Sequence, residues 1–428
     1  MSQTREPPHP RRIFRQKKDH LPHDIVLNIL ANLPAKSVLR FRCVSKTWDS
    51  SITTPSFIST HLNLNNSNNN LAYLISCAST PIDSHFDNTT TLNSTIPSFI
   101  GGYDSTFNRI SEYPIPSGFP SSCYDTADSC NGLVCFTDHE YLPTSTGDIY
   151  LWNPSIRKLQ RLPGFSPTQY HWVSTGFAYQ SNTNDYKVVK FSQMTRPDNS
   201  GIEAEAEVYT LSSNSWRRVG ISLANNFIGL PVDSGTSTFV SGALHWLGNV
   251  FGAASRSMIL SFDVNNDKFG ERALPHVQQQ QLLPQGVMAI PNCLMVFKGK
   301  LGFITLGYLL LDHINNDVYR DYIGSHANSC FIWVMGEYGV HESWSKLIFV
   351  QFENVASVRF FGCTSRGELL VIKKLNPESN TERRRFMVVS LDLETSLEKD
   401  LGFQKVPYIA TTFMESLVLL DGATELSG

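Results

Sequence analysis

The chain has 428 residues, of which 41% are hydrophobic, 11% aromatic and 17% charged, and its formal net charge is −3. This length is too great for one small fold and predicts about three domains, or one small module followed by one large domain. The apolar content is sufficient for a folded core and excludes disorder throughout the chain. The lack of net positive charge excludes a general nucleic-acid binder, so we expect no nucleic-acid partner.

Residues 1–19 are rich in proline and basic side chains, which predicts a disordered leader, with a nuclear localisation signal as the alternative. No apolar run has the length and position of a signal peptide or a membrane-spanning helix. We therefore expect a protein of the cytoplasm, the nucleus or both, with no membrane partner. The eight cysteines form no C-x-x-C pair, which in a reducing compartment predicts buried thiols rather than disulfides or a metal site.

The first predicted element lies in LPHDIVLNILANL, residues 21–33. Apolar residues repeat at positions 25, 29 and 33, and a second apolar row at positions 26 and 30 lies beside them, so we expect a helix with a wide apolar arc. A proline and an acidic residue near its start and a proline directly after it predict a helix from about His23 to Asn32.

Two more short helices are predicted, one in AKSVLRFRCV at residues 35–44 and one that Ser45 caps and that carries Trp48 and Ile52. Three helices of this size cannot bury all of their apolar side chains among themselves. The surplus apolar surface contacts either a partner protein or the rest of this chain, and the helices alone do not decide between the two.

Residues 21–48, LPHDIVLNILANLPAKSVLRFRCVSKTW, closely resemble the F-box. The similarity lies in the Leu-Pro opening, the acidic residue before an Ile/Val/Leu run, the internal Leu-Pro and the Lys-Ser-x-Leu-Arg-Phe-Arg-Cys-Val-Ser-Lys-x-Trp ending. The resemblance implies an F-box helical module at residues 20–62 that docks on a Skp-type adaptor, which links it to cullin and RING subunits in an SCF ubiquitin ligase. It assigns the adaptor contacts to Leu21, Pro22, Ile25, Ile29, Leu33, Pro34, Val38, Leu39, Val44 and Trp48.

The asparagine-rich residues 63–70 predict a linker. From residue 71 to residue 428, short runs of Val, Ile, Phe, Tyr and Leu alternate with clusters of Gly, Asn, Asp and Ser, which indicates many short strands. A hairpin that begins with an apolar-x-apolar strand recurs at positions 150, 209, 262, 338 and 391. The spacing corresponds to a period of about fifty residues, in the range of propeller blades.

Each period supplies about four strands, which predicts five complete blades. A sixth blade would join a C-terminal pair, YIATTF and ESLVLL, to an N-terminal pair near LAYLISC and HFDNTTTLN, so that no long sheet edge stays open. We therefore predict an all-β, six-bladed propeller closed by its N- and C-terminal strands, with seven blades as the alternative. The complete blades are predicted at residues 121–163, 170–220, 236–275, 291–350 and 356–403.

This region also resembles the plant F-box-associated domain, in phrases such as SCNGLVCF, WNPSIRKLQRLP, FVSGALHWLG and EYGVHESWSKL. The resemblance implies a domain that recruits the target protein. The double glycine of true kelch repeats is absent, so the repeats are only kelch-like. Large rings fill wedge-shaped gaps well, so we expect packing between blades, not ligand binding, for Trp152, Trp216, Trp246, Trp333 and Trp344.

The residues that bind the target are unknown from the sequence. In a four-strand meander the longer connections lie together on one face, and long loops on a rigid scaffold commonly carry recognition. We therefore expect the target on the face formed by residues 192–204, 222–234, 276–286 and 313–329, although these loops are also interpretable as tolerated insertions.

We find no GxSxG, GxGxxG, Walker or HExxH motif, and the pairs His139-Glu140 and His341-Glu342 lack a second ligand four residues on. We therefore expect no catalytic residue, cofactor or metal; a propeller hydrolase with scattered residues is a remote alternative. The favoured function is a non-catalytic substrate receptor of an SCF-type ubiquitin ligase. The alternative is an interaction module that sequesters the adaptor or a partner without degradation.

Overall fold

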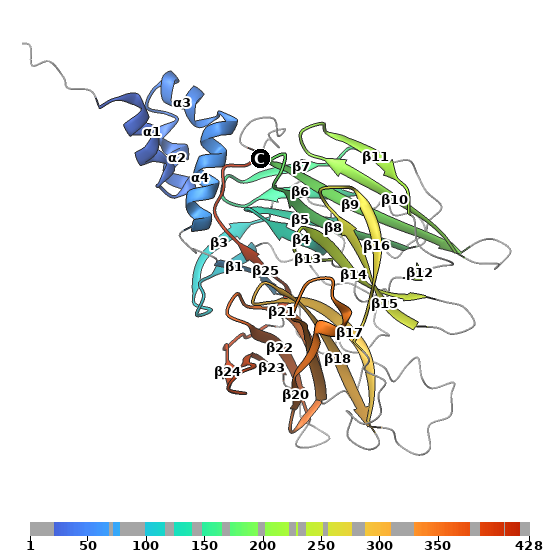
Figure 1. Cartoon of the computed structure of the whole chain (residues 1–428). Helices are drawn as coiled ribbons and strands as arrows, with labels where there is room; N and C mark the ends of the chain where they lie inside the picture. Colours follow the sequence, from blue (N-terminus) through green and yellow to red (C-terminus); the bar gives the residue numbers. More distant parts are fainter. Residues whose placement is uncertain are drawn as a thin grey trace, which may run out of the picture.

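The structure is a computed structural model in which a module of four helices lies beside a ring of β-sheets (Figure 1). It describes residues 21–67, 72–77, 99–115, 124–138, 148–164, 172–195, 202–221, 228–229, 237–250, 256–275, 287–309, 329–376, 386–405 and 407–419. The predicted leader, residues 1–19, lies outside these ranges. Within the described part of the chain, no helix is both long enough and apolar enough to span a membrane.

The helical module contains α1 (His23–Ala31), α2 (Ala35–Phe41), α3 (Lys46–Ile52) and α4 (Pro55–Ser67). Pro22 precedes α1 and Pro34 precedes α2, and at the start of a helix the missing N–H of proline costs no helical hydrogen bond. Ser45 caps α3, because its side chain accepts a hydrogen bond from the backbone N–H of Trp48 at 3.1 Å. The first three helices confirm the predicted pattern, except that α2 ends at Phe41.

Helix α4 does not appear in the sequence-based prediction, which places a linker at residues 63–70. The helix continues to Ser67, so the first part of that segment is helical and only its end lies outside the described residues. The signal for its start is Thr54, whose Oγ1 accepts the backbone N–H of Phe57 at 3.3 Å, followed by a proline at the first helical position. Buried His61 and Leu62 then anchor the helix against the module.

The propeller has six blades of antiparallel strands, as predicted. Their innermost strands contact one another around the axis. From the innermost strand outward, blade 1 contains β25 (Pro407–Phe413), β1 (Ala72–Cys77), β2 (Phe99–Tyr103) and β3 (Arg109–Pro114), and blade 2 contains β4 (Tyr124–Cys130), β5 (Leu133–Asp138), β6 (Ile149–Asn153) and β7 (Lys158–Arg161). Blade 3 contains β8 (Trp172–Gln180), β9 (Asp185–Thr195), β10 (Ile202–Thr210) and β11 (Ser215–Val219).

In blade 4, β12 (Ile228–Gly229) and β13 (Thr238–Val240) both pair with β14 (Ala243–Val250), which is followed by β15 (Arg256–Asp263) and β16 (Lys268–Ala273). Blade 5 contains β17 (Val287–Phe297), β18 (Lys300–Leu309), β19 (Ser329–Met335) and β20 (Trp344–Gln351). Blade 6 contains β21 (Val355–Cys363), β22 (Glu368–Leu375), β23 (Phe386–Asp392) and β24 (Glu398–Asp400).

Both chain ends close the ring in blade 1, where β25 pairs antiparallel with β1 and Ala72 lies opposite Phe413. The C-terminus contributes one strand and the N-terminus three, which corrects the predicted two-plus-two arrangement. The reason is that the predicted strand ESLVLL forms no strand: its residues 415–419 pack between blade 2 and the helical module instead. The segment HFDNTTTLN lies outside the described residues.

Short turns join the first two strands of several blades. Asn131-Gly132, Ser241-Gly242 and Lys298-Gly299 all have positive φ at both residues, which suits the two-residue hairpin turn that matches the twist of the strands. By contrast, residues 192–195 and 202–204 belong to β9 and β10, so most of the first predicted long loop is strand. The predicted loop 276–286 and all but the last residue of the predicted loop 313–329 lie outside the described residues, and loop 222–234 is described only at β12.

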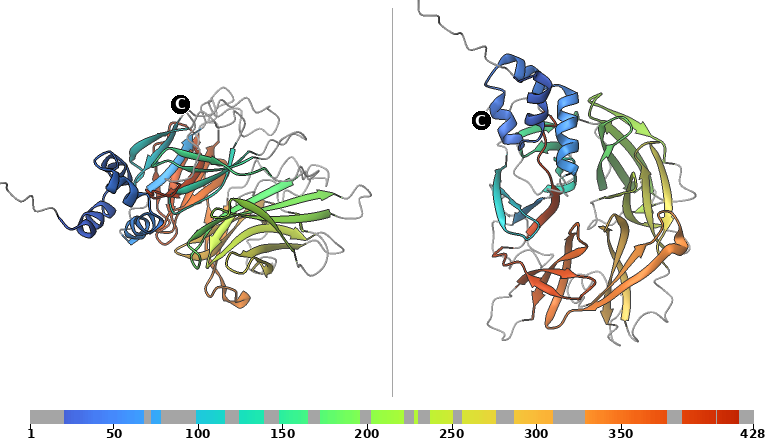
Figure 2. Two further views of the ribbon diagram at one scale, coloured as in Figure 1. Left: turned by 90° about the horizontal axis from the view of Figure 1, so that it is seen from above. Right: turned by 60° about the vertical axis from the view of Figure 1, so that its left-hand side comes forward.

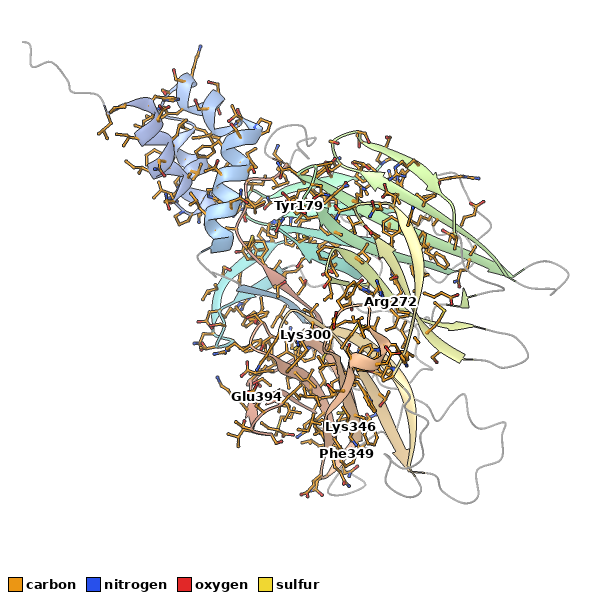
Figure 3. The ribbon with its side chains drawn as sticks, viewed as in Figure 1. Tyr179, Arg272, Lys300, Lys346, Phe349 and Glu394 are labelled. Carbon is orange, nitrogen blue, oxygen red and sulfur yellow. The ribbon has the colours of Figure 1, made fainter. Side chains whose placement is uncertain are left out.

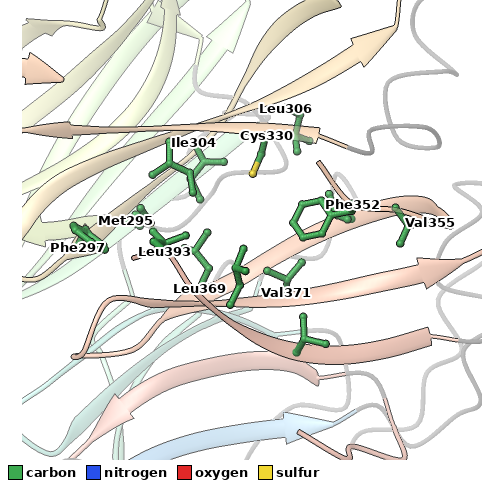
Figure 4. Packing of buried hydrophobic residues seen from close by; sticks show 14 of the residues in the cluster. Met295, Phe297, Ile304, Leu306, Cys330, Phe352, Val355, Leu369, Val371 and Leu393 are labelled. Carbon is green, nitrogen blue, oxygen red and sulfur yellow. The ribbon is translucent and has the colours of Figure 1, made fainter. Parts of the chain in front are cut away.

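Much of the apolar core lies between neighbouring blades. Figure 4 shows the cluster between blades 5 and 6, where Cys330 and Phe352 meet Leu369 and Val371. The five predicted tryptophans take part in such contacts. Trp246 of blade 4, for example, is 0% exposed and its Nε1 donates to the carbonyl oxygen of Thr175 in blade 3 at 3.3 Å. Inter-blade packing is therefore confirmed as the role of these rings.

Figure 2 shows the helical module outside the ring of strands, beside blades 1 and 2. The module lies at those ends of the two blades where the short turns are. This follows from Ile156, which lies in the turn between β6 and β7 and packs on the helical core. Because the strands of each blade are antiparallel, the ends opposite the short turns, such as Thr195 of β9 and Leu309 of β18, lie on the other side of the propeller. The long connections therefore start from the side of the propeller that faces away from the module.

Candidate functional site

The inner face of the helical module forms a small apolar core. Its buried members are Leu30, Ala31, Ala35, Val38, Ile52, Phe57 and Leu417. All of them except Leu417 come from the four helices, and Leu417 comes from the C-terminal segment of the chain. On this face the helices therefore pack on another part of the same chain. This is one of the two alternatives that the sequence leaves open for the surplus apolar surface, the other being a partner protein.

The outer face of the module exposes large apolar side chains, which form the candidate functional site. Leu21 and Val44 are each 60% exposed, Ile29 is 50% exposed and Ile25 is 48% exposed. Ile25 and Ile29 lie one helical turn apart on α1, so they form one row. Figure 3 shows side chains projecting from these helices on the side away from the propeller. Exposed apolar groups of this size on adjoining elements are typical of a protein–protein contact.

The ten residues predicted to contact an adaptor fall into three groups. Besides the four exposed apolar residues, Pro22 and Pro34 are exposed. Leu33, Leu39 and Trp48 are partly buried against the helical core. Val38 is 0% exposed and packs in the helical core with residues of α1, α3 and α4, and its predicted adaptor contact stays a prediction.

Polar contacts inside the module hold the end of α1 in place. His61 of α4 donates from Nε2 to the carbonyl oxygen of Leu33 at 2.9 Å, and its Nδ1 accepts from the side-chain amide of Asn65 at 3.3 Å. Burial lowers the pKa of His61, more than the carbonyl of Leu33 and the charge of Glu415 raise it. A neutral imidazole satisfies both contacts, so the geometry and the direction of the pKa shift agree.

Two domain families match the chain in these two regions. Residues 19–60 match the F-box domain, and residues 98–418 match the F-box associated beta propeller domain. The chain belongs to the F-box proteins with an F-box-associated β-propeller. The combination supports a substrate-recognition role in SCF-type ligases in general, in which an F-box binds a Skp-type adaptor.

Curated relatives from Arabidopsis thaliana extend over both regions of this F-box protein. It is 27% identical to an F-box/kelch-repeat protein over 77% of this chain and 79% of the relative. It is also 27% identical to the F-box protein CPR1 over 93% of this chain and 89% of the relative. The match with CPR1 therefore covers nearly all of both chains and includes both the helical module and the propeller of this chain.

Sequence reasoning missed that the C-terminal segment takes part in this module. The backbone N–H of Ala35 at the start of α2 donates to Oε2 of Glu415 at 2.9 Å, and Asn65 donates to the carbonyl oxygen of Glu415 at 3.2 Å. The run ESLVLL is as apolar as strands such as β19 (SCFIWVM) and β22 (ELLVIKKL), which are buried on both faces. The local pattern therefore gives no signal that this segment forms no strand.

The propeller of the F-box protein has a small polar pocket on the side of the short turns, between blades 5 and 6. Its volume is about 200 Å³, and it is lined by Phe297, Lys298, Arg366, Gly367, Glu368, Asp392 and Glu394. Lys298 pairs with Glu394, and Arg366 lies 3.6 Å from the carboxylate of Glu368. These charges neutralise one another within the pocket, which is therefore a weak candidate for ligand recognition.

The described residues contain no group of three His, Cys, Asp or Glu side chains able to hold a metal ion. His341 and Glu342 lie in a short 3-10 helix, η5 (His341–Ser343), while His139 and Glu140 lie outside the described residues. Nearby, Arg272 of blade 4, which is labelled in Figure 3, lies 4.4 Å from the ring centre of Tyr338. This cation–π contact links the turn before η5 to blade 4.

The cysteines follow the prediction only in part. Cys135 and Cys330 are buried, and Cys130, Cys293 and Cys363 are partly buried. Burial raises the pKa of Cys293 and Cys330 to about 12, so these thiols are unreactive at neutral pH. Cys43 is exposed, in contrast to the expectation, because it follows the end of α2 on the outer side of the module.

Proposed function

We propose that this F-box protein is the substrate-recognition subunit of an SCF-type ubiquitin ligase. It binds a Skp-type adaptor through the exposed apolar row of α1, with Leu21 before it and Val44 beside it. The observation that supports this proposal is the division of the module into a buried inner face and an exposed apolar outer face. A helix that served only to pack on the propeller would not keep Ile25 and Ile29 half exposed.

The propeller holds the target protein in this proposal. The adaptor-binding helices lie at the short-turn ends of blades 1 and 2, so the opposite face is free to meet the target (Figure 1). Tethering the target near the charged carrier enzyme makes ubiquitin transfer effectively intramolecular, which raises its rate through local concentration. The chain itself supplies no catalytic group.

The adaptor contact is tested with Ile29→Asp in the full-length chain. A carboxylate in the centre of an apolar interface would be desolvated without a partner, so the affinity for a purified Skp-type adaptor should fall at least a hundredfold. Leu397→Asp is the matched control, because Leu397 is 70% exposed on the propeller. Unchanged adaptor binding by Ile29→Asp would refute the proposed contact.

The target face is tested by replacing residues 310–328 with a Gly-Ser segment of equal length. These residues connect Leu309, at the end of β18, to Ser329, at the start of β19, and both strand ends lie on the side of the propeller away from the helices. The control replaces the turn residues 181–184 on the other face. Loss of target capture from cell extract only in the first variant supports the proposed face, and equal capture by both variants contradicts it.

Ubiquitination in a reconstituted complex separates the ligase role from sequestration. A receptor promotes ubiquitination of its captured partner when adaptor, cullin, RING subunit and carrier enzyme are present. A sequestering module binds the same partner and leaves it unmodified, which would contradict the proposal.

A further inference from the structure

The residues after the closing strand β25 form a segment that contacts both parts of the chain. We call Met414–Leu419 the C-terminal strap. Within it, Met414 is 7% exposed, Ser416 and Leu417 are 0% exposed and Leu419 is 9% exposed. A terminal segment that is buried to this extent is held by specific partners on both sides.

On one side, the strap completes the F-box module. Leu417 inserts into the helical core, which among the described residues otherwise contains side chains from residues 26–64 and the partly buried Ile156. Glu415 accepts the backbone N–H of Ala35, a group that has no partner within α2 because it lies in the first turn. The strap therefore supplies both an apolar side chain and a hydrogen-bond acceptor that the four helices lack.

On the other side, the strap is bound by blade 2. Asn153, at the end of β6, is 0% exposed, and its Nδ2 donates to the carbonyl oxygens of Ser416 at 3.1 Å and Val418 at 2.8 Å. The backbone N–H of Ser155 donates to Oδ1 of Asn153 at 2.9 Å, which turns the amide so that Nδ2 faces the strap. The hydroxyl of Ser155 in turn accepts the backbone N–H of Ser416 at 3.2 Å.

The turn between β4 and β5 also approaches the strap closely. Gly132 has φ +82°, and a Cβ atom at this position would lie 2.5 Å from Cβ of Ser416 and 2.7 Å from the carbonyl oxygen of Met414. Glycine is therefore required both by the turn and by the strap. Gly132 and Asn153 belong to SCNGLVCF and WNPSIRKLQRLP, two phrases by which the sequence resembles the F-box-associated domain. These phrases thus have a role apart from target binding.

We infer that the C-terminal strap fixes the orientation of the F-box module on the propeller and makes the module's stability depend on closure of the ring. Strap and closing strand are continuous, since β25 ends at Phe413 and the strap starts at the next residue. When β25 is not paired with β1, Leu417 is not held in the helical core. The effect of the strap on orientation and stability does not depend on the proposed function. Only its benefit rests on that function: a fixed module holds adaptor and target in a constant relative position.

Amide hydrogen exchange of the full-length chain tests the inference without any adaptor. Leu417→Ala should accelerate exchange in peptides from residues 23–65 at least tenfold, while peptides from blades 5 and 6 keep their wild-type rates. The matched control is Leu391→Ala, because Leu391 is 1% exposed in blade 6 and its loss leaves a similar cavity away from the helices. The control should accelerate exchange in blades 5 and 6 and leave the helical peptides unchanged.

A milder variant covers the case in which Leu417→Ala does not fold. Glu415→Ala removes the acceptor of Ala35 and should accelerate exchange of that amide several-fold in an otherwise protected chain. Removal of residues 414–428 should also broaden the distance distribution in small-angle scattering, whereas removal of residues 420–428 should not. Wild-type exchange of the helical peptides in every folded strap variant would overturn the inference.

Adaptor binding by the wild-type chain is measured separately. If the wild-type chain fails to bind a Skp-type adaptor, the proposed function fails while the exchange data still decide on the strap. If the adaptor binds wild-type and strap variants alike and their exchange rates are equal, the strap inference fails and the proposed function stands.

Discussion

The helical module and the propeller bury their apolar residues in different ways. In the propeller, large clusters lie between neighbouring blades, so each blade is stabilised from both sides and the ring has no free end. The helical module has one small cluster, which requires Leu417 from the other end of the chain, and it still exposes four large apolar residues. The closed ring thus buries its apolar side chains within its own sheets. The short helical module needs contacts with the rest of the chain for its stability, and part of its apolar surface stays exposed and can bind a partner.

The largest expected effect concerns the wedge between blades 3 and 4. Trp246→Ala should lower the free energy of unfolding by about 3–5 kcal/mol, because a fully buried ring is replaced by a cavity. Denaturation in urea, followed by tryptophan fluorescence and near-UV circular dichroism, measures the loss. Trp246→Phe keeps most of the side-chain volume and should lose clearly less stability than Trp246→Ala. A loss below 1 kcal/mol in the alanine variant would show that packing between blades 3 and 4 contributes little to their stability.

The next effect is a pH dependence within the propeller. Burial raises the pKa of Asp128 on β4 to about 7, more than the hydrogen bond from the backbone N–H of Ser129 lowers it. The folded state therefore binds the proton of the Asp128 carboxyl group more tightly than the unfolded state does. The stability that the protonated carboxyl contributes is present below pH 3.8 and is lost as the pH rises to about 7. Asp128→Asn should stabilise the chain above pH 7, by at most about 4 kcal/mol.

Thermal unfolding at pH 5 and pH 8 measures this difference, because the gain from Asp128→Asn should be larger at pH 8. Asp104→Asn is the control: hydrogen bonds from Thr106 and Asn108 lower the pKa of Asp104, so its charge does not change between these two pH values. A gain from Asp128→Asn that is equal at both pH values would contradict the assignment.

A smaller effect is expected in the core of the helical module. Ile52 is 0% exposed, and Ile52→Val should cost about 0.5–1.5 kcal/mol. Because the module has one small core, the change should appear as faster exchange of amides in α1–α4. Ile372→Val in blade 6 makes the same change at a residue that is also 0% exposed, and it should leave these amides unchanged. Faster exchange in both regions for either variant would mean that the two parts unfold as one unit.

The smallest change in stability is expected on the outer face. Ile25→Ser removes an apolar group that is already 48% exposed, so the free chain should change in stability by no more than about 0.5 kcal/mol. Affinity for a Skp-type adaptor, measured by calorimetry, should nevertheless fall about tenfold or more. Lys36→Ser, on an exposed position of α2, provides a control for general effects of surface substitution. A stability loss above 1 kcal/mol would place Ile25 in the core instead.

The sequence predicts those features that depend on local pattern. The helices at α1 and α3 follow from apolar spacing and from the Ser45 cap, and the blade count follows from a recurring hairpin. The inter-blade tryptophans are predictable because their size and strand positions leave few other roles. These features require no knowledge of contacts between distant parts of the chain.

The features that sequence reasoning missed depend on distant contacts. Val38 packs in the helical core with Leu30, Ile52 and Phe57, which belong to the three other helices. The asparagine-rich end of α4 is unusual for a helix, but the side-chain amide of Asn65 donates to His61 and to the carbonyl oxygen of Glu415, and no local pattern shows the second contact. Likewise, Leu417 lies 365 positions after Ile52 in the chain, so nothing in the F-box segment indicates that its core is incomplete.

The separation of Leu417 from the F-box along the chain also has a consequence for protein synthesis. Leu417 is translated 365 residues after Ile52. At rates of 5–20 residues per second this interval lasts roughly 20–70 seconds. During this interval the helical core lacks the side chain that Leu417 inserts into it. A receptor that joined a ligase in this interval would do so with an incomplete helical module.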